Sequence, residues 1–298
     1  MINRRRFIQG SAAAATIVSP LSALASDVLR LPRRPIPGTE DSLPVIGLGN
    51  SNAFRQGDVD TSKRIIRTLT DYGGSYIDCG GQSRFVVGNV VSSLDVAEDV
   101  FLGTYFTGAD DANARAEAAR LLEITGKPML DLMHNYPEDA APNWDTFRGW
   151  KDEGLTRYIG VSRHRKEAYP TMMEMMKTGT VDVLQVNYSP LETEAEDEIL
   201  PLAMDKGVAV TINRPFINGR FFQVVSGHDV PEWAAEFDCE SWAQFSLKFI
   251  LSHPAVHCVL TETTNPRHAV DNIGAGFGRL PDEATRQRMV AHLRGLAG

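Results

Sequence analysis

The sequence predicts a single closed (β/α)8 barrel, and two observations lead to this fold class. Short apolar runs alternate with longer amphipathic stretches from Leu43 onward, and eight such runs can be counted. Each run is apolar at consecutive positions, which is typical of a parallel strand that is buried on both faces. A chain of 298 residues also has the length that α/β barrels commonly use for one domain. Eight strands alternating with eight helices favour a closed barrel over an open sheet.

The predicted strands are the apolar runs themselves, at residues 45–48, 76–77, 100–102, 130–133, 158–161, 183–186, 208–212 and 258–260. The clearest helical patterns place apolar side chains three and four positions apart. They lie at 60–72, 113–125, 195–206 and 240–252, and residues 284–293 predict a closing helix. The alternative, an open dinucleotide-binding sheet, needs a GxGxxG turn, and Gly47-Leu48-Gly49-Asn50-Ser51-Asn52 lacks the last glycine.

Residues 1–26 predict an export signal. Asn3-Arg4-Arg5-Arg6-Phe7-Ile8 is a twin-arginine motif, and Ala23-Leu24-Ala25 offers small residues for cleavage before Ser26. The Ala-rich run between them is too short to span a bilayer. We therefore expect transport by the twin-arginine export machinery to the periplasm or the medium, without a stable membrane anchor.

The rest of the chain divides into two parts. Residues 27–42 are rich in Pro and Arg and are expected to form a linker or an N-terminal hairpin. Residues 43–298 are expected to form the barrel. The net charge of -8, from 30 basic and 38 acidic residues, argues against a nucleic-acid partner.

Two polar residues mark a site, because function in such a barrel lies at the carboxyl ends of its strands. Asp78 ends the second predicted strand, and His134 ends the fourth. A metal site from Asp78, Cys79 and His134 lacks a second histidine at ligand spacing. A hydrolase triad of Ser83, His134 and Asp78 lacks a G-x-S-x-G turn. The three cysteines form no CxxC pair, which excludes a zinc ribbon and leaves one disulfide open.

Three segments resemble motifs of the aldo-keto reductases: residues 73–83, 100–105 and 130–134. The resemblance extends from Leu43 to Pro281 through four more segments, at 151–162, 183–191, 241–254 and 263–272. It implies a barrel in which an Asp, a Tyr, a Lys and a His protonate a carbonyl while NADPH delivers hydride. Asp78 and His134 match that tetrad, but Ser83 stands where the Tyr is expected and Tyr105 where the Lys is expected.

The same resemblance implies a nicotinamide site. Ser162 and Gln185 would contact the carboxamide, and Tyr188 would stack on the ring. The residues implied for the rest of the dinucleotide are Arg214 for the pyrophosphate, Thr263 and Thr264 for the adenosine phosphate, Arg267 or His268 for a 2′-phosphate, and Asn272 for adenine. Glu262 departs from the family pattern. A carboxylate there disfavours a 2′-phosphate, so NADP, NAD and weakened binding all stay open.

Two functions follow from these residues. The first is an aldo-keto reductase-like oxidoreductase that acts on a carbonyl or alcohol with an altered proton donor. In this hypothesis Tyr105 and His134 share the role of the acid, and Asp78 is their charge partner. The alternative is a catalytically silent or repurposed barrel that binds a small molecule or a protein partner in the periplasm. The segment 216–239 is expected to cover the pocket.

Overall fold

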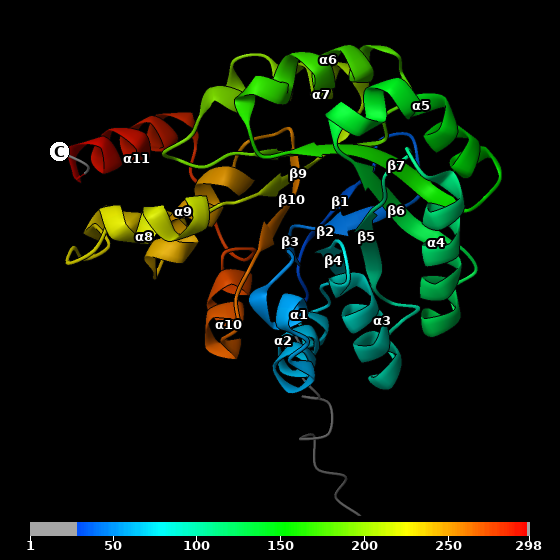
Figure 1. The fold of residues 1–298 in the computed structure, drawn as a ribbon. Helices are drawn as coiled ribbons and strands as arrows, with labels where there is room; N and C mark the ends of the chain where they lie inside the picture. The colour runs from blue at the N-terminus through cyan, green and yellow to red at the C-terminus, as the bar shows by residue number, and fades with distance from the viewer. Residues whose placement is uncertain (1–28, 297–298) are drawn as a thin grey trace, which may run out of the picture.

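Eight parallel strands close on themselves in the order β10-β3-β4-β5-β6-β7-β8-β9, with β10 also paired to β9. Helices surround this barrel (Figure 1). The computed structural model describes residues 29–296, so the predicted export signal lies outside the described residues. All eight predicted strands are present, and the predicted (β/α)8 fold is confirmed.

The strands carry the numbering of Figure 1. Their bounds are β1 Arg33–Pro35, β2 Ser42–Pro44, β3 Ile46–Leu48, β4 Tyr76–Cys79, β5 Phe101–Tyr105, β6 Leu130–Asn135, β7 Thr156–Arg163, β8 Val183–Asn187, β9 Ala209–Asn213 and β10 Val256–Thr261. The helices are α1 Asn52–Gln56, α2 Val59–Asp71, α3 Ser83–Ser93, α4 Asp111–Thr125, α5 Pro137–Asp152, α6 Tyr169–Lys177, α7 Ile199–Lys206, α8 Arg220–Val224, α9 Trp242–Leu251, α10 Pro266–Gly274 and α11 Glu283–Leu296. Short 3-10 turns at Ile217–Gly219 and Glu232–Phe237 lie between β9 and α9.

The first two strands form an antiparallel hairpin that covers one end of the barrel. Arg34 anchors it, because its guanidinium donates to the carbonyls of Leu251 (2.7 Å) and Val256, next to the start of β10. Ile36 and Leu43 of the hairpin pack on the apolar layer inside the barrel. That layer comprises Tyr76, Phe101, Leu132, Tyr158, Val183, Ala209, Cys258 and Leu260. The end with the amino termini of the strands is therefore closed.

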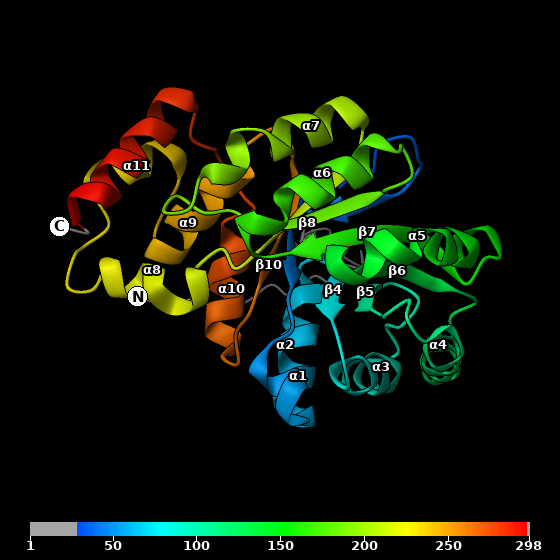
Figure 2. The same cartoon turned by 45° about the horizontal axis from the view of Figure 1, so that its top comes forward.

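A second and larger apolar cluster lies between the strands and the surrounding helices. Helix α2 shows how the sequence builds it: the Asp58 side chain caps its first turn by accepting from the Thr61 N–H at 3.0 Å. Its residues Ile65, Ile66 and Leu69 are then fully buried at helical spacing. Both Figure 1 and Figure 2 show α8, α9 and α11 gathered on one side of the barrel.

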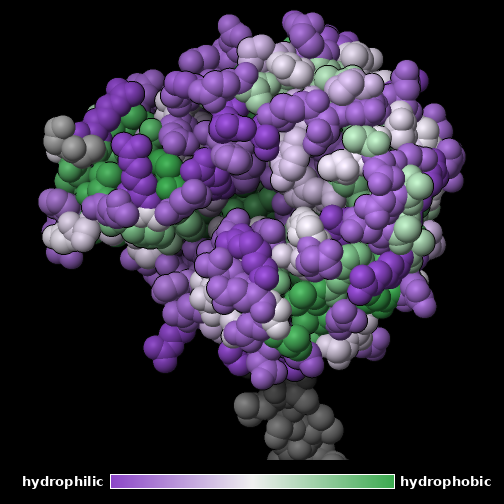
Figure 3. Space-filling model, viewed as in Figure 1, coloured by the Kyte–Doolittle hydropathy of each residue, from purple (hydrophilic) through white to green (hydrophobic). Residues whose placement is uncertain are grey.

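The face of the molecule seen in Figure 3 is mostly hydrophilic, with smaller apolar areas between. Within residues 29–296, no helix combines the length and the apolar character that a membrane crossing requires. The three cysteine thiols are free and buried.

Candidate active site

A polar layer lies directly above the apolar layer inside the barrel, towards the carboxyl ends of the strands. Side chains alternate between the two faces of a strand, so a residue two positions after an interior residue is also interior. Tyr76 and Asp78 on β4 follow this rule, as do Leu132 and His134 on β6. The polar layer consists of Asp78, Tyr105, His134, Ser162, Gln185 and Asn213.

The Tyr105 hydroxyl is the centre of this layer. It lies 3.0 Å from Asp78 Oδ2, 3.1 Å from Ser162 Oγ and 2.7 Å from Gln185 Oε1. A phenol has one hydrogen to donate, so it donates to one of these oxygens at a time. Asn213 supports the arrangement by donating its amide N–H to Gln185 Oε1 at 3.2 Å. Four strands thus hold one hydroxyl in place.

His134 belongs to the same layer and shares the neighbours Gln185 and Asp78 with Tyr105. Its Nε2 lies 3.2 Å from the Tyr76 hydroxyl and 3.4 Å from Gln185 Nε2, and its Nδ1 has no partner. The ring stacks on Tyr105 with the centroids 5.3 Å apart, and no hydrogen bond joins it to the Tyr105 hydroxyl among the described residues. Burial lowers the pKa of His134 to about 3, which favours the neutral imidazole.

Asp78 has the opposite shift. Burial raises its pKa to about 7, although hydrogen bonds from Tyr105, Gln185 and Tyr76 act in the other direction. Burial, and then the Asp78 charge, raise the pKa of Tyr105 and of Tyr76 well above the usual range. The proton of this layer that titrates near neutral pH is consequently the one on Asp78.

Two glycines make room for these side chains. A Cβ on Gly103 of β5 would lie 2.6 Å from Asp78 Oδ1 and 2.9 Å from the Tyr76 hydroxyl. A Cβ on Gly160 of β7 would lie 2.7 Å from His134 Nδ1. These distances are shorter than van der Waals contact allows. The polar layer therefore depends on glycine, which has no Cβ, at both positions.

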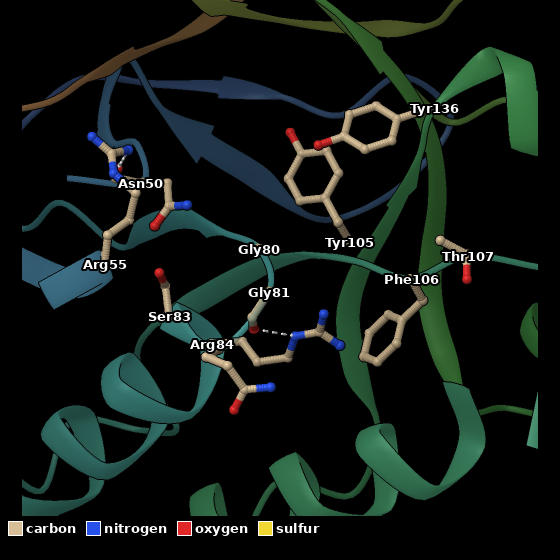
Figure 4. Close-up of a pocket in the computed structure, with 11 residues that line it drawn as sticks. Asn50, Arg55, Gly80, Gly81, Ser83, Arg84, Tyr105, Phe106, Thr107 and Tyr136 are labelled. Carbon is tan, nitrogen blue, oxygen red and sulfur yellow. Dashed lines mark hydrogen bonds between the residues drawn. The ribbon is translucent and has the colours of Figure 1, made fainter. Parts of the chain in front are cut away.

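The polar layer opens into a cavity of about 830 Å³ at the carboxyl ends of the strands. Seven of the predicted site residues line it: Asp78, Tyr105, Ser162, Gln185, Arg214, Thr263 and Thr264. A second cavity of about 580 Å³ adjoins it and shares Asn50, Arg55, Gly80, Tyr105 and Tyr136 with it. Ser83 lines this second cavity (Figure 4).

The other predicted site residues lie elsewhere. Tyr188 is fully buried on the outer side of the barrel, where its ring packs on Phe249 and its hydroxyl meets Glu196 and Arg286. The expectation that Tyr188 stacks on a ring in the cavity is wrong, because this side chain faces away from it. Arg267 and His268 are exposed at the start of α10, Asn272 is buried under that helix, and none of the three is on the cavity wall.

Four residues of the site were missed from the sequence: Tyr76, Tyr136, Asn213 and Arg55. Tyr76 and Tyr136 each lie two positions from a predicted site residue, so strand alternation could have found them. The Tyr136 ring centroid lies 5.4 Å from that of Tyr105. The Arg163 guanidinium lies over the Tyr136 ring, 4.4 Å from its centroid. Asn213 is the last residue of β9. A polar residue at the carboxyl end of a barrel strand is itself an indication of a site residue.

Arg55 forms an ion pair with Glu262 at 3.3 Å on the wall of the larger cavity. Both side chains are about half exposed, at 44% and 49%. Desolvation raises the pKa of Glu262, and Arg55 opposes this shift. Arg55 thus offsets part of the cost of a charge on Glu262.

The loop after β9 also borders the cavity, and its backbone is strained. Arg214, Ile217 and Asn218 have φ values of 50°, 51° and 53°. A β-branched residue such as Ile217 rarely adopts this conformation. Arg214 is held there by a hydrogen bond from its Nε to Asn218 Oδ1 at 3.0 Å. Phe216 and Phe222 of the same segment line the cavity, whereas Phe221 is fully buried.

Known proteins share this architecture. The sequence profile of the Aldo/keto reductase family matches residues 45–289. The chain belongs to the aldo/keto reductase family. Its sequence is 23% identical over 211 residues to the NADH-specific methylglyoxal reductase of Escherichia coli, a match that covers 59% of this chain and 64% of that protein.

Two solved structures of this family have the same fold. The holo form of an aldo-keto reductase from Bacillus halodurans aligns with a TM-score of 0.71 at 19% identity, covering 89% of this chain and 96% of the other. An aldo/keto reductase from Klebsiella pneumoniae, in complex with NADP and acetate, aligns with a TM-score of 0.67 at 21% identity. That alignment covers 85% of this chain and 94% of the other.

The larger cavity fits the nicotinamide cofactor of this family. It has the volume and the few convergent polar groups that cofactor sites require. Asn213 Oδ1 and Asn50 Oδ1 are buried on its walls without a partner, as expected where a polar ligand completes the site. Ser162 and Gln185 would hold a carboxamide, and Arg214, Thr263 and Thr264 would hold phosphates. Among residues 29–296, no cluster of three His, Cys, Asp or Glu residues has the geometry of a metal site.

Proposed function

We propose that this protein is a nicotinamide-dependent oxidoreductase of carbonyls and alcohols in which Asp78 and Tyr105 together supply the proton. The observation that carries the proposal is the 3.0 Å contact between the Tyr105 hydroxyl and a buried carboxyl whose pKa is about 7. A bound nicotinamide supplies hydride. The chain's own residues then have to protonate the carbonyl oxygen.

Tyr105 alone is a poor acid, because burial and the Asp78 charge raise its pKa. Protonated Asp78 changes this situation. As Tyr105 gives its hydrogen to the substrate oxygen, the phenol oxygen takes the hydrogen of the Asp78 carboxyl. A free phenolate is never formed, and Asp78 regains a proton from solvent between turnovers. A donor with a pKa near 7 is close to the optimum for acid catalysis at neutral pH.

His134, Ser162 and Gln185 have supporting parts in this scheme. The neutral His134 ring stacks on Tyr105 and fixes its direction. Ser162 and Gln185 approach the Tyr105 hydroxyl in the present geometry, and a carboxamide would compete for their polar groups. Cofactor binding would then leave Asp78 as the main partner of Tyr105. Relative to the tetrad that the family resemblance implies, the phenol has moved from the position of Ser83 to the neighbouring strand.

Tyr105→Phe tests the proposal directly. We expect kcat for carbonyl reduction by the mature protein to fall by roughly 10²–10⁴-fold, the usual worth of general acid catalysis. Reduction by the wild type should decline above pH 7, where Asp78 ionises. Tyr72→Phe, a remote tyrosine at the end of α2, serves as the matched control. Full turnover by Tyr105→Phe would refute the role of this hydroxyl.

For the cofactor, we propose NADH over NADPH. The support is Glu262 on the wall of the larger cavity, since a carboxylate there favours a ribose diol over a 2′-phosphate. The E. coli relative is NADH-specific by name, whereas the Klebsiella structure holds NADP. Competitive titration with NADH and NADPH decides between the two.

We also propose that the twin-arginine motif exports the protein in folded form, with its cofactor already bound. Cell fractionation tests the location of the protein. Mass spectrometry of the natively exported protein tests whether a cofactor is bound to it. A co-purifying dinucleotide supports the enzyme. One observation favours the alternative, a silent or repurposed barrel. The charged group next to the Tyr105 phenol is the Asp78 carboxylate, and its negative charge raises the pKa of the phenol and so suppresses ionisation of Tyr105. Exported protein that carries no dinucleotide and binds none when it is added would support this alternative.

A further inference from the structure

The smaller cavity beside Tyr105 has a lining of one charge sign. Its eleven lining residues include Arg55 and Arg84 and no acidic residue (Figure 4). The acids that pair with these arginines, Glu262 at 3.3 Å and Glu117 at 2.9 Å, lie outside the lining. The wall that a ligand would touch is therefore cationic or neutral throughout.

The first turn of α3 contributes to this wall. Residues 80–84 line the cavity, and α3 begins at Ser83 without a side-chain cap and without an acid in its first turn. By contrast, α2 and α4 begin with a capping aspartate, Asp58 or Asp110, and a further acid in the first turn. The unsatisfied N–H groups and the positive end of the helix dipole at α3 are the features that bind anions.

A second observation points to a ligand at the same place. Ser83 is only 5% exposed, and no described residue forms a hydrogen bond with its hydroxyl. In Figure 4 this hydroxyl points into the cavity, towards the side chain of Asn50. The Ser83 hydroxyl is thus a donor that faces a space that none of the described residues fills.

We propose that this cavity is a subsite for an anionic group of the substrate, a carboxylate or a phosphate, held by Ser83, Arg55 and the start of α3. The identification of the bound molecule as a substrate rests on the proposed function, because Tyr105 lines both cavities and would meet the carbonyl of the same molecule. A serine at position 83 leaves the space that a large side chain would occupy. The exchange that removes a phenol therefore creates room for the acidic end of a substrate.

The test uses small anions and needs neither cofactor nor turnover. Acetate, inorganic phosphate and the uncharged acetamide are titrated into the mature wild-type protein and followed by NMR chemical shifts. We expect acetate or phosphate to bind at least tenfold more tightly than acetamide. Stronger acetate binding identifies a carboxylate as the natural group, and stronger phosphate binding identifies a phosphate ester.

Variants then locate the site. Ser83→Tyr fills the cavity and should abolish anion binding, and Ser83→Ala, the milder change, should weaken it about tenfold. Ser93→Ala, at an exposed position on the same helix, is the matched control and should bind as the wild type does. Anion binding that is no tighter than acetamide binding, or that survives both Ser83 variants unchanged, would overturn the proposal. Failure of the Tyr105 test alone would leave these titrations unaffected, so the two proposals can fail separately.

Discussion

The raised pKa of Asp78 makes a prediction about stability that is independent of any substrate. Its pKa is about 7 in the folded protein and 3.8 for the free group. Between these two pH values the folded state holds a proton that the unfolded state has released. The free energy of unfolding therefore decreases as pH rises from about 4 to about 7, and it stays low above that range.

The magnitude follows from the shift. About 3 pH units at ~1.36 kcal/mol each give ~4 kcal/mol as the cost of an ionised Asp78 at pH 8. Asp78→Asn removes the titrating group and with it this slope. The Asn amide also disturbs the hydrogen bond from Tyr105, which costs roughly 1–3 kcal/mol at every pH. The variant should thus be less stable than the wild type at pH 5 and should approach or exceed it at pH 8.

Urea denaturation at a series of pH values from 5 to 8 measures this difference. The quantity to compare is the slope of the unfolding free energy against pH, which should be more negative in the wild type by up to ~1.4 kcal/mol per pH unit. Asp145→Asn, at a position that is 96% exposed, is the control and should keep the slope of the wild type. Parallel curves for wild type and Asp78→Asn would show that Asp78 is ionised throughout, and the proposed proton source would be lost with it.

Three further predictions concern the packing and the cofactor. Gly103→Ala should reduce the unfolding free energy by ~1–3 kcal/mol in urea denaturation, because its Cβ meets Asp78 and Tyr76, whereas Gly149→Ala, whose Cβ would meet only Glu153 Oε1 at 4.0 Å, should not. Arg286→Ala should cost ~3–5 kcal/mol in the same assay, because it leaves Glu196 without its buried partner; a loss below 1 kcal/mol would contradict this. Glu262→Gln should shift the ratio of NADPH to NADH affinity towards NADPH by about tenfold in a competition titration, and an unchanged ratio would remove Glu262 from cofactor selection.

The barrel could be predicted from the sequence because its strands are buried on both faces. Such strands appear as short apolar runs, and all eight runs form strands of the barrel. The strand ends were less accurate: β7 spans Thr156–Arg163, where the apolar run covers only four residues. Its polar ends, including Ser162, belong to the strand because they complete ladders to β6 and β8.

The error at Tyr188 shows which physical rule was left unused. Gln185 of β8 faces the interior of the barrel. Tyr188 follows it by three positions, an odd number, so strand alternation directs its side chain to the opposite, outer face. Tyr188 therefore packs between the barrel and its outer helices, where Arg286 of α11 meets its hydroxyl at 2.6 Å. Asn213, two strand positions after Thr211, faces the cavity at the end of the next strand. The closeness of Asn213 to Gln185 follows from the register of β8 and β9, which pairs Asn187 with Asn213 and Gln185 with Thr211.

The relation between Asp78 and Tyr105 could not be derived from either residue alone. An aspartate at a strand end predicts an ionised group, and a tyrosine in the place of a lysine predicts a loss of positive charge. The structure places Cys79 opposite Thr104 and Asp78 opposite Gly103, so Tyr105 reaches across the ladder to the carboxylate. Among residues 29–296 no lysine or arginine pairs with the buried carboxylate to offset its desolvation, and its pKa rises. In the proposed mechanism, the same exchange that weakens Tyr105 as an acid keeps a proton on Asp78 near pH 7. On this proposal, the loss of the positive charge and the gain of a second proton carrier both follow from one change in the barrel interior.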